Sequence, residues 1–439
     1  MASISRLPMA FQLLRHLNAS REKIVAFRDR HLRRLIHHAY RNVPYYKELF
    51  DKAGIKPEDI RTADDLKHLP LTSKQDLKER PLEQILARGF KPSKLIRERT
   101  TGTTGMPFTT YRSRLDSFIS QAVRFRVHLY YGRGSRDHLA CVVSSPAPKR
   151  PFVMHVLELI GRYRQSHISI QRSVEEIAGA LLQLKPDVIV GNSAAIVEAS
   201  RVLQSADPQP LRPRFITTGG EVLTPMMRKQ LQDIFRCPVH DCYASFEMSL
   251  AAWQCPETGK YHVNDDCLVL EVLPQDAPEM TSEEAAGGTW GEAVVTVLHS
   301  YAMPFIRYRM EDLVRKEPGL CGCGMPFSTL RAIEGRRADY FYLPDGRLLY
   351  SVGIAHIIQS EAPWIAQYEV IQETESRILI RFRPEAPPSQ DKIEGLRSKV
   401  MAFVGRESGV EVGISLVSEI KPGPGGKYRL LWSRLSPWH

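Results

Sequence analysis

The chain has 439 residues, 43% of them hydrophobic and 25% charged, with a formal net charge of +11. This length exceeds one ordinary domain, so we expect two or three globular domains, without repeats or low-complexity tracts. No apolar run is long enough for a membrane span, and the N-terminus lacks the apolar core of a signal peptide, which favours a cytoplasmic protein. Seven cysteines, an odd number without a secretion signal, indicate thiols or metal ligands rather than disulfides.

The positive charge leaves nucleic-acid binding open as a minor alternative. The basic residues are scattered, apart from the stretch 21–41, and no zinc-finger, helix-turn-helix or RNA-recognition signature accompanies them. An enzyme that handles anionic nucleotides and acids would carry the same balance of charge.

The first predicted element is an amphipathic helix over residues 20–42. It ends near Pro44, because proline disfavours a helical conformation in the residue before it. The apolar residues that recur at helical spacing are Ile24, Phe27, Leu32, Leu35, Ile36 and Ala39.

From residue 139 to residue 243 the chain alternates short β-rich runs with helical segments. This rhythm predicts an α/β domain whose sheet is mainly parallel, with functional residues on loops at the carboxyl ends of the strands. The predicted strands are 139–144, 188–190, 215–218 and 239–243, and the predicted helices are 153–163, 173–184, 193–203 and 225–235.

After residue 260 the pattern becomes antiparallel, and a break follows near residues 334–339. The pattern of the last hundred residues predicts a small α+β unit. The expected strands are 268–273, 293–299, 304–309, 367–372, 378–382 and 410–417, and the expected helix is 393–404. We therefore expect a large N-terminal domain, 1–335, with an antiparallel subdomain beside its parallel sheet, and a small C-terminal domain, 336–439.

A run of threonine and glycine supplies hydroxyls and bare backbone N–H groups. It comprises Thr100, Thr101, Gly102, Thr103, Thr104 and Gly105. Such a loop can wrap phosphate oxygens, although it lacks the Walker spacing, and a plain surface turn is the alternative.

Further motifs follow this loop along the chain. They are Gly219-Gly220-Glu221, Tyr243-Ala244-Ser245-Phe246-Glu247, Arg307-Tyr308-Arg309 with Asp312, Gly335-Arg336 with Asp339, and Gly425-Gly426-Lys427. In this order they resemble the adenylate-forming enzymes (the acyl-CoA synthetase superfamily), and more narrowly the phenylacetate–CoA ligase branch with its capsule-biosynthesis CapK relatives. The segments 42–47 and 69–77, and Cys321-Gly322-Cys323-Gly324, resemble features of that branch.

The resemblance implies that the Thr100–Gly105 loop holds the β- and γ-phosphates of ATP. It also implies that Glu247 binds Mg²⁺, a hard cation that prefers oxygen ligands. Tyr243 would stack on adenine beside Ser245, and Gly219, Gly220 and Glu221 would line the adenine pocket. The alternatives are a surface carboxylate, a tyrosine at the edge of the core, and a plain tight turn.

Three residues nearer the C-terminus receive roles in the same way. Asp312 would accept both ribose hydroxyls, unless it forms a salt bridge with Arg307 or Arg309. Arg336 would contact the nucleotide from the hinge. Lys427, carried by a small mobile domain, would neutralise the charge that develops during adenylation and would then withdraw. A surface arginine and a solvated lysine are the alternatives.

The chain departs from the family pattern around these residues. The lysine that usually follows the second loop glycine is Met106, which removes one phosphate-facing cation. The residues with a chemical role remain while their neighbours differ, for example Glu311 where the family has glycine. This pattern indicates a specialised active enzyme.

A second group of residues suggests a metal site. Cys255, His262, Cys321 and Cys323 offer three thiolates and one imidazole, a donor set typical of structural Zn²⁺, and relatives with this cysteine arrangement hold such a zinc. Cys267 could replace one ligand, and reduced, partly buried cysteines are the alternative. The zinc would stabilise a subdomain at 250–330. Cys141, Cys237 and Cys242 are predicted as core thiols.

The expected activity is ATP- and Mg²⁺-dependent activation of an aryl or otherwise hydrophobic carboxylic acid, followed by transfer of the acyl group to a thiol, CoA. An amine or hydroxyl acceptor, nucleotidyl transfer alone, and a non-catalytic nucleotide- or nucleic-acid-binding protein are the alternatives. By analogy a homodimer is expected. Candidates for the acid pocket are Tyr130, Tyr131, Phe152 and Phe246.

Overall fold

The structure is a computed structural model. It describes residues 7–99, 108–143, 152–204, 211–221, 223–274, 288–336, 340–345, 348–362, 364–405, 408–421 and 430–435. Within these ranges, no helix combines the length and the apolar character that a bilayer span requires.

The N-terminal region is helical, and its longest helix confirms the first prediction. The hydroxyl of Ser20 caps the start of α2, Arg21–Asn42, and the helix stops two residues before Pro44. All six apolar residues predicted for its inner face are buried. The other described helices of this region are α1 (Leu7–Arg15), α3 (Pro44–Ala53), α4 (Lys74–Lys78) and α5 (Leu82–Ile85).

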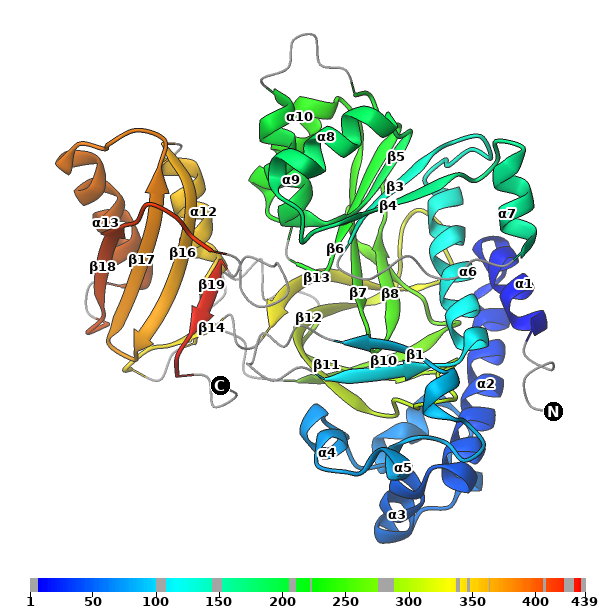
Figure 1. Cartoon of the computed structure of the whole chain (residues 1–439). Helices are drawn as coiled ribbons and strands as arrows, with labels where there is room; N and C mark the ends of the chain where they lie inside the picture. Colours follow the sequence, from blue (N-terminus) through cyan, green and yellow to red (C-terminus); the bar gives the residue numbers. More distant parts are fainter. Residues whose placement is uncertain are drawn as a thin grey trace.

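Eleven strands of the described chain form one sheet, in the order β10-β11-β12-β13-β9-β8-β7-β6-β5-β3-β4. The run from β7 to β4 is parallel, as the strand–helix rhythm predicts. Its apolar residues pack against those of α8, α9 and α10 (Figure 1). The elements are β3 (Leu139–Val143), α7 (Phe152–Leu159), β4 (Gln165–Ser169), α8 (Val174–Leu184), β5 (Val188–Asn192), α9 (Ser193–Gln204), β6 (Phe215–Gly219), α10 (Pro225–Phe235) and β7 (Val239–Ser245).

The antiparallel strands continue the same sheet rather than forming a separate layer. They are β8 (Ser249–Gln254), β9 (Tyr261–Val263), β10 (Leu268–Pro274), β11 (Thr289–Val297), β12 (Tyr308–Leu320) and β13 (Ser328–Arg336). The strand predicted over 304–309 was wrong in its start, because β12 begins only at Tyr308. Arg307 has a φ of 46°, outside the strand region, and its carbonyl accepts a hydrogen bond from the backbone N–H of Thr72.

Two elements lie between the N-terminal helices and the parallel strands. A hairpin of β1 (Ile96–Arg99) and β2 (Thr109–Arg112) precedes the long helix α6 (Arg114–Tyr130). Apolar residues of α6, among them Val123 and Val127, pack with Leu250 and Trp253 of β8 (Figure 1).

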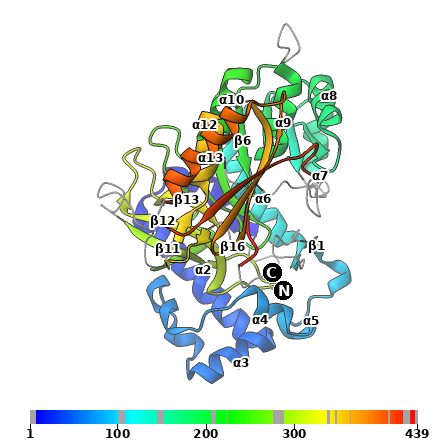
Figure 2. The same ribbon diagram turned by 90° about the vertical axis from the view of Figure 1, so that its left-hand side faces the viewer.

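The C-terminal unit has its own core and confirms the predicted α+β pattern. Its four-stranded sheet has the order β18-β17-β16-β19 within the described chain, and α12 and α13 pack together against it (Figure 2). The elements are β14 (Tyr340–Tyr342), β15 (Leu348–Tyr350), α12 (Val352–Glu361), β16 (Ile365–Thr374), β17 (Arg377–Pro384), α13 (Gln390–Val404), β18 (Glu411–Leu416) and β19 (Leu431–Ser433). The guanidinium of Arg201 on α9 donates a hydrogen bond to the carbonyl of Ala366 on β16, at 2.9 Å, and so joins the two units.

Candidate active site and metal cluster

The local structure explains why glycine occupies two positions at the carboxyl end of β6. A Cβ on Gly219 would lie 2.8 Å from the carbonyl oxygen of Cys242 on β7, so the missing side chain lets the two strands approach. Gly220 has a φ of 83°, which glycine adopts without strain. Glu221 follows, and its carbonyl accepts a hydrogen bond from Ser193 at 3.3 Å. This turn lies at the edge where parallel sheets bind ligands.

The structure brings Tyr243 and Asp312 into direct contact, although 69 positions separate them. The Tyr243 hydroxyl, at the carboxyl end of β7, donates a hydrogen bond of 2.5 Å to Oδ2 of Asp312 on β12. The register between β11 and β12 shifts beside this point, and Glu311 has a φ of 61°, in the left-handed region where the family pattern has glycine. The bulge thus turns the Asp312 carboxylate toward β7.

The two arginines that could have formed a salt bridge with Asp312 pair elsewhere. Arg309 contacts Glu292 through two nitrogens, at 2.9 and 2.6 Å, and Arg307 contacts Glu271 at 2.9 Å. Each of these carboxylates therefore holds its own arginine in place, and the Tyr243 hydroxyl helps to orient Asp312.

Glu247 lies in a turn that its neighbours fix. The Ser245 hydroxyl accepts hydrogen bonds from the backbone N–H groups of Glu247 and Met248, at 3.2 and 3.3 Å. The Glu247 side chain is 9% exposed, and no described residue is paired with its carboxylate. A carboxylate without a partner among the described residues suits a divalent cation held together with phosphate oxygens.

The hairpin β1–β2 secures the same turn from the other side. Arg112 donates a hydrogen bond to the carbonyl of Phe246 and forms an ion pair of 3.2 Å with Glu98. The predicted phosphate loop, 100–105, lies outside the described residues, but the strands on either side of it pair, with Arg99 opposite Thr109. The two ends of that loop are therefore anchored beside the Glu247 turn.

Of the last two candidates for the nucleotide site, the structure describes the backbone of Arg336 but not Lys427. The backbone of Arg336 ends β13 directly opposite Asp312 in the antiparallel register, so the hinge residue lies next to the candidate ribose carboxylate; its side chain lies outside the described part. Lys427 also lies outside the described residues.

Asp241 is a buried carboxyl group close to these residues on β7. It accepts hydrogen bonds from the hydroxyls of Tyr261, at 2.8 Å, and Thr218, at 3.0 Å. Burial raises the pKa of Asp241 from 3.8 to about 6, because desolvation outweighs the two hydrogen bonds that favour the ionised form. Sequence reasoning missed this residue, since a lone aspartate within a strand carries no motif.

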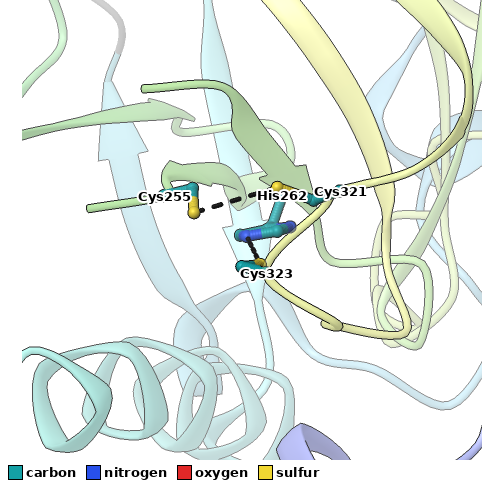
Figure 3. A group of neighbouring side chains, drawn as sticks. All are labelled: Cys255, His262, Cys321 and Cys323. Carbon is teal, nitrogen blue, oxygen red and sulfur yellow. Dashed lines mark hydrogen bonds between the residues drawn. The ribbon is translucent and has the colours of Figure 1, made fainter. Parts of the chain in front are cut away.

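Cys255, His262, Cys321 and Cys323 form a compact cluster, as the sequence predicts (Figure 3). Cys255 follows β8, His262 lies on β9, and the other two occupy the turn between β12 and β13. Their ligand atoms all lie within 4.8 Å of one another. Cys267 is not part of this group: it is packed in the core with Trp253 and Phe327.

The spacing of the donor atoms fits a tetrahedral zinc ion. With Zn–S bonds of about 2.3 Å and Zn–N bonds of about 2.0 Å, two sulfurs lie about 3.8 Å apart, and a sulfur and a nitrogen about 3.5 Å apart. The observed separations are 3.9 Å between Sγ of Cys321 and Cys255, and 3.4 Å between Sγ of Cys323 and Nε2 of His262. Burial lowers the pKa of His262 to about 4, so the imidazole is neutral, as a ligand must be.

The cluster lies far from the candidate nucleotide residues along the sheet. β8 runs antiparallel to β7, with Trp253 opposite Cys242, so Cys255 lies toward the start of β7 and Glu247 follows its end. A metal there would hold β8, β9 and the β12–β13 turn together.

Comparison with known proteins finds relatives that cover most of the chain. No protein-family model matches the chain. The phenylacetate–coenzyme A ligase of Thermus thermophilus is 22% identical over 444 residues, covering 93% of this chain and 96% of that ligase. The enzyme of the same name from Escherichia coli K12 is 27% identical over 352 residues, 73% of each chain. Protein CapK of Staphylococcus aureus is 21% identical, covering 89% of this chain and 84% of CapK.

The fold agrees with this relationship. A crystal structure of 2-hydroxyisobutyryl-CoA ligase in its postadenylation state superposes with a TM-score of 0.75 at 18% identity, covering 96% of this chain and 91% of that chain. Over most of its length the chain is thus similar in sequence to phenylacetate–CoA ligases and to CapK, and it shares the fold of an acyl-CoA ligase. The predicted fold is confirmed, with the difference that the antiparallel strands extend the parallel sheet.

Two of the aromatic residues suggested for the acid pocket pack against residues of β7 and β8. The ring of Tyr131 stacks on His240, at the start of β7, with centroids 4.0 Å apart, and its hydroxyl donates to the carbonyl of Gln254. Tyr130 packs against Trp253 at 4.8 Å. Both therefore lie toward the cluster end of the sheet, because α6 ends there.

Proposed function

We propose that this chain activates a carboxylic acid with ATP and passes the acyl group to the thiol of CoA. The acid carboxylate would attack the α-phosphorus, releasing pyrophosphate and forming an acyl-adenylate. The thiol would then attack the acyl carbon and release AMP. The observation that carries the proposal is the convergence of Tyr243, Asp312 and the Glu247 turn at one edge of the sheet.

We assign the nucleotide as follows. Asp312, oriented by the Tyr243 hydroxyl, accepts the ribose hydroxyls, and the adenine lies beside the Gly219–Glu221 turn. Glu247 offers its carboxylate to Mg²⁺, which when bound neutralises phosphate charge. The hairpin β1–β2 supports the phosphate loop, and Arg112 keeps the Glu247 turn against it.

The division into domains is part of the same proposal. Residues 1–335 form the adenylation domain, and residues 336–439 form a small domain that brings Lys427 to the reacting carboxylate and then withdraws it. The separate core of the C-terminal unit supports this division. ATP and CoA as substrates favour a cytoplasmic location, and the homodimer remains a prediction.

We propose a structural Zn²⁺ in the cluster of Cys255, His262, Cys321 and Cys323. The donor set and the spacing of the ligand atoms support it, and the position at the opposite end of β7 favours a role in stability rather than in catalysis.

ATP–pyrophosphate exchange with a panel of carboxylic acids tests the activation step. Exchange that depends on one class of acid supports the proposal, and its absence with every acid contradicts it. Addition of CoA, then of amines and alcohols, identifies the acceptor.

The variant Lys427→Ala separates the two half-reactions. We expect it to lose adenylate formation while it retains thioester formation from a synthetic acyl-adenylate, because the lysine acts only in the first step. Equal loss of both half-reactions would refute that role.

A further inference from the structure

Helix α7 presents apolar side chains to solvent near its end. Leu159 and Ile160 are the most exposed of the large apolar side chains that the structure describes, at 87% and 65%, and Val156 is 42% exposed. Val156 and Leu159 are three positions apart, so they share one side of α7, and Ile160 directly follows its last residue. Single exposed apolar residues are common, but a neighbouring group exposed to this extent indicates a contact surface.

A second segment lies against the end of α7. The backbone N–H of Tyr163 donates a hydrogen bond to the carbonyl of Ser135 at 2.6 Å, and the guanidinium of Arg162 donates to the Ser135 hydroxyl at 2.8 Å. Ser135 lies between α6 and β3, and Leu129, near the end of α6, is 40% exposed. Residues 129–138 and 156–164 thus form one surface, the α6–α7 tip, beside the outermost strand β4 and on the outside of the molecule (Figure 1).

The charged side chains that the α6–α7 tip exposes are basic. Arg136, Arg162 and Arg164 are exposed. The two carboxylates of these segments are turned to the backbone: Glu158 accepts a hydrogen bond from a backbone N–H at 3.3 Å, and Asp137, which is buried, accepts one at 2.6 Å. The tip therefore combines exposed apolar side chains with a net positive charge.

From these observations we infer that the α6–α7 tip binds the surface of a membrane that contains anionic phospholipids. Leu159 and Ile160 would enter the boundary between headgroups and acyl chains, and the arginines would lie close to the lipid phosphates. Charge complementarity favours an anionic over a neutral surface. A protein partner fits less well, because a stable interface involves about 20–30 residues on each side, whereas this tip exposes four large apolar side chains.

The position of the tip leaves the candidate nucleotide site free. Residues 129–138 precede β3 and residues 159–164 precede β4, so the tip lies at the amino edge of the parallel strands. The turns after β6 and β7, which carry the candidate nucleotide residues, lie at the opposite, carboxyl edge of the same parallel strands. A protein bound to a membrane through the tip would keep that edge accessible to solution, and the inference does not depend on the proposed activity.

Sedimentation with lipid vesicles tests the inference. The probes are vesicles of phosphatidylcholine alone and of phosphatidylcholine mixed with phosphatidylglycerol. We expect the full chain to partition at least tenfold more strongly onto the anionic vesicles, and added salt should weaken this binding. Leu159→Ser combined with Ile160→Ser should lower the partition coefficient at least tenfold, because two aliphatic side chains no longer enter the lipid. Arg136→Gln combined with Arg164→Gln should lower it at least fivefold, and this pair spares Arg162, which bonds to Ser135.

Matched variants elsewhere on the surface control for hydrophobicity and for charge. Leu416→Ser removes an apolar side chain that is 49% exposed on β18, and Arg34→Gln with Arg41→Gln removes two exposed charges from α2. Both should bind vesicles as the wild type does. Because every substituted side chain is exposed, all variants should keep the melting temperature of the wild type.

Fluorescence quenching shows whether the tip enters the lipid. Anionic vesicles with brominated acyl chains should quench the added fluorescence of Ile160→Trp, and should leave that of Leu416→Trp unquenched. Three results overturn the inference: a wild type that does not prefer anionic vesicles, equal binding by the Leu159→Ser/Ile160→Ser variant, and equal quenching of the two tryptophan variants. A wild type that is dimeric by light scattering, and that this double variant makes monomeric, would instead show that the tip joins two copies of the chain, which also overturns it.

Discussion

Replacement of Asp241 by asparagine should stabilise the large domain at neutral pH. The pKa of Asp241 is about 6 in the folded chain against an ordinary value of 3.8. The difference of about 2.2, at about 1.4 kcal/mol for each pKa unit, corresponds to about 3 kcal/mol by which ionisation destabilises the fold at pH 7. Asparagine removes the charge while its amide oxygen can still accept a hydrogen bond from Tyr261 or Thr218.

The sign of the pH dependence follows from proton binding. Between about pH 4 and pH 6 the folded chain holds a proton on Asp241 that the unfolded chain has released, so this group's contribution to the free energy of unfolding falls as the pH rises. The variant lacks this dependence. The difference in unfolding free energy between Asp241→Asn and the wild type should therefore grow from near zero at pH 4 to at most about 3 kcal/mol at pH 7.5.

Urea unfolding of the large domain, followed by tryptophan fluorescence at half-unit steps of pH, measures this difference. Asp233→Asn, on the exposed side of α10, is the control, because its surface pair with Lys229 should contribute less than about 1 kcal/mol without a comparable trend. A difference for Asp241→Asn that stays constant over this range, or that makes the variant less stable at pH 7.5, would refute the argument that desolvation outweighs the two hydrogen bonds.

The remaining predictions concern the candidate sites. Tyr243→Phe keeps the ring but removes the hydrogen bond to Asp312; we expect the KM for ATP to rise about tenfold, the value of one hydrogen bond to a charged group, and an unchanged KM would show that the hydroxyl does not orient the carboxylate. Glu247→Gln should shift the Mg²⁺ concentration that gives half-maximal exchange upward by tenfold or more, and an unshifted titration would remove Glu247 from the metal site. Cys323→Ser should reduce the zinc content well below one equivalent and lower the melting temperature, whereas Cys267→Ser should retain the metal; full zinc in the first variant would contradict the cluster as its site.

Local sequence patterns predicted a large part of the fold. The inner face of α2 follows from helical spacing, and all six residues are buried as expected. The helix α6 was not predicted, although Ser113 and Asp116 form a capping box at its start. Polar residues obscured its apolar periodicity, since Gln121, Arg124 and His128 interrupt the pattern that a surface helix would show.

The two candidate sites also differ in how far local sequence patterns could predict them. The metal cluster could be found from residue types, because three cysteines and a histidine with short spacings within each half leave few alternatives. The contact between Tyr243 and Asp312 could not be predicted from spacing alone, because it depends on a bulge and a left-handed residue, Glu311, in a strand that the sequence placed several residues too early. Strand pairing across 69 residues is a property of tertiary packing, and no local pattern encodes it.

Three arginines near the candidate site, Arg112, Arg307 and Arg309, are each held by a carboxylate partner. Met106 stands where the family pattern has a lysine, so the chain lacks one positive charge that would face phosphate. The described arginines nearby cannot easily replace it: Arg112 is held by Glu98 and the Phe246 carbonyl, Arg309 by Glu292 and Arg307 by Glu271. To recruit any of them, the protein would have to break an ion pair that is at least partly buried.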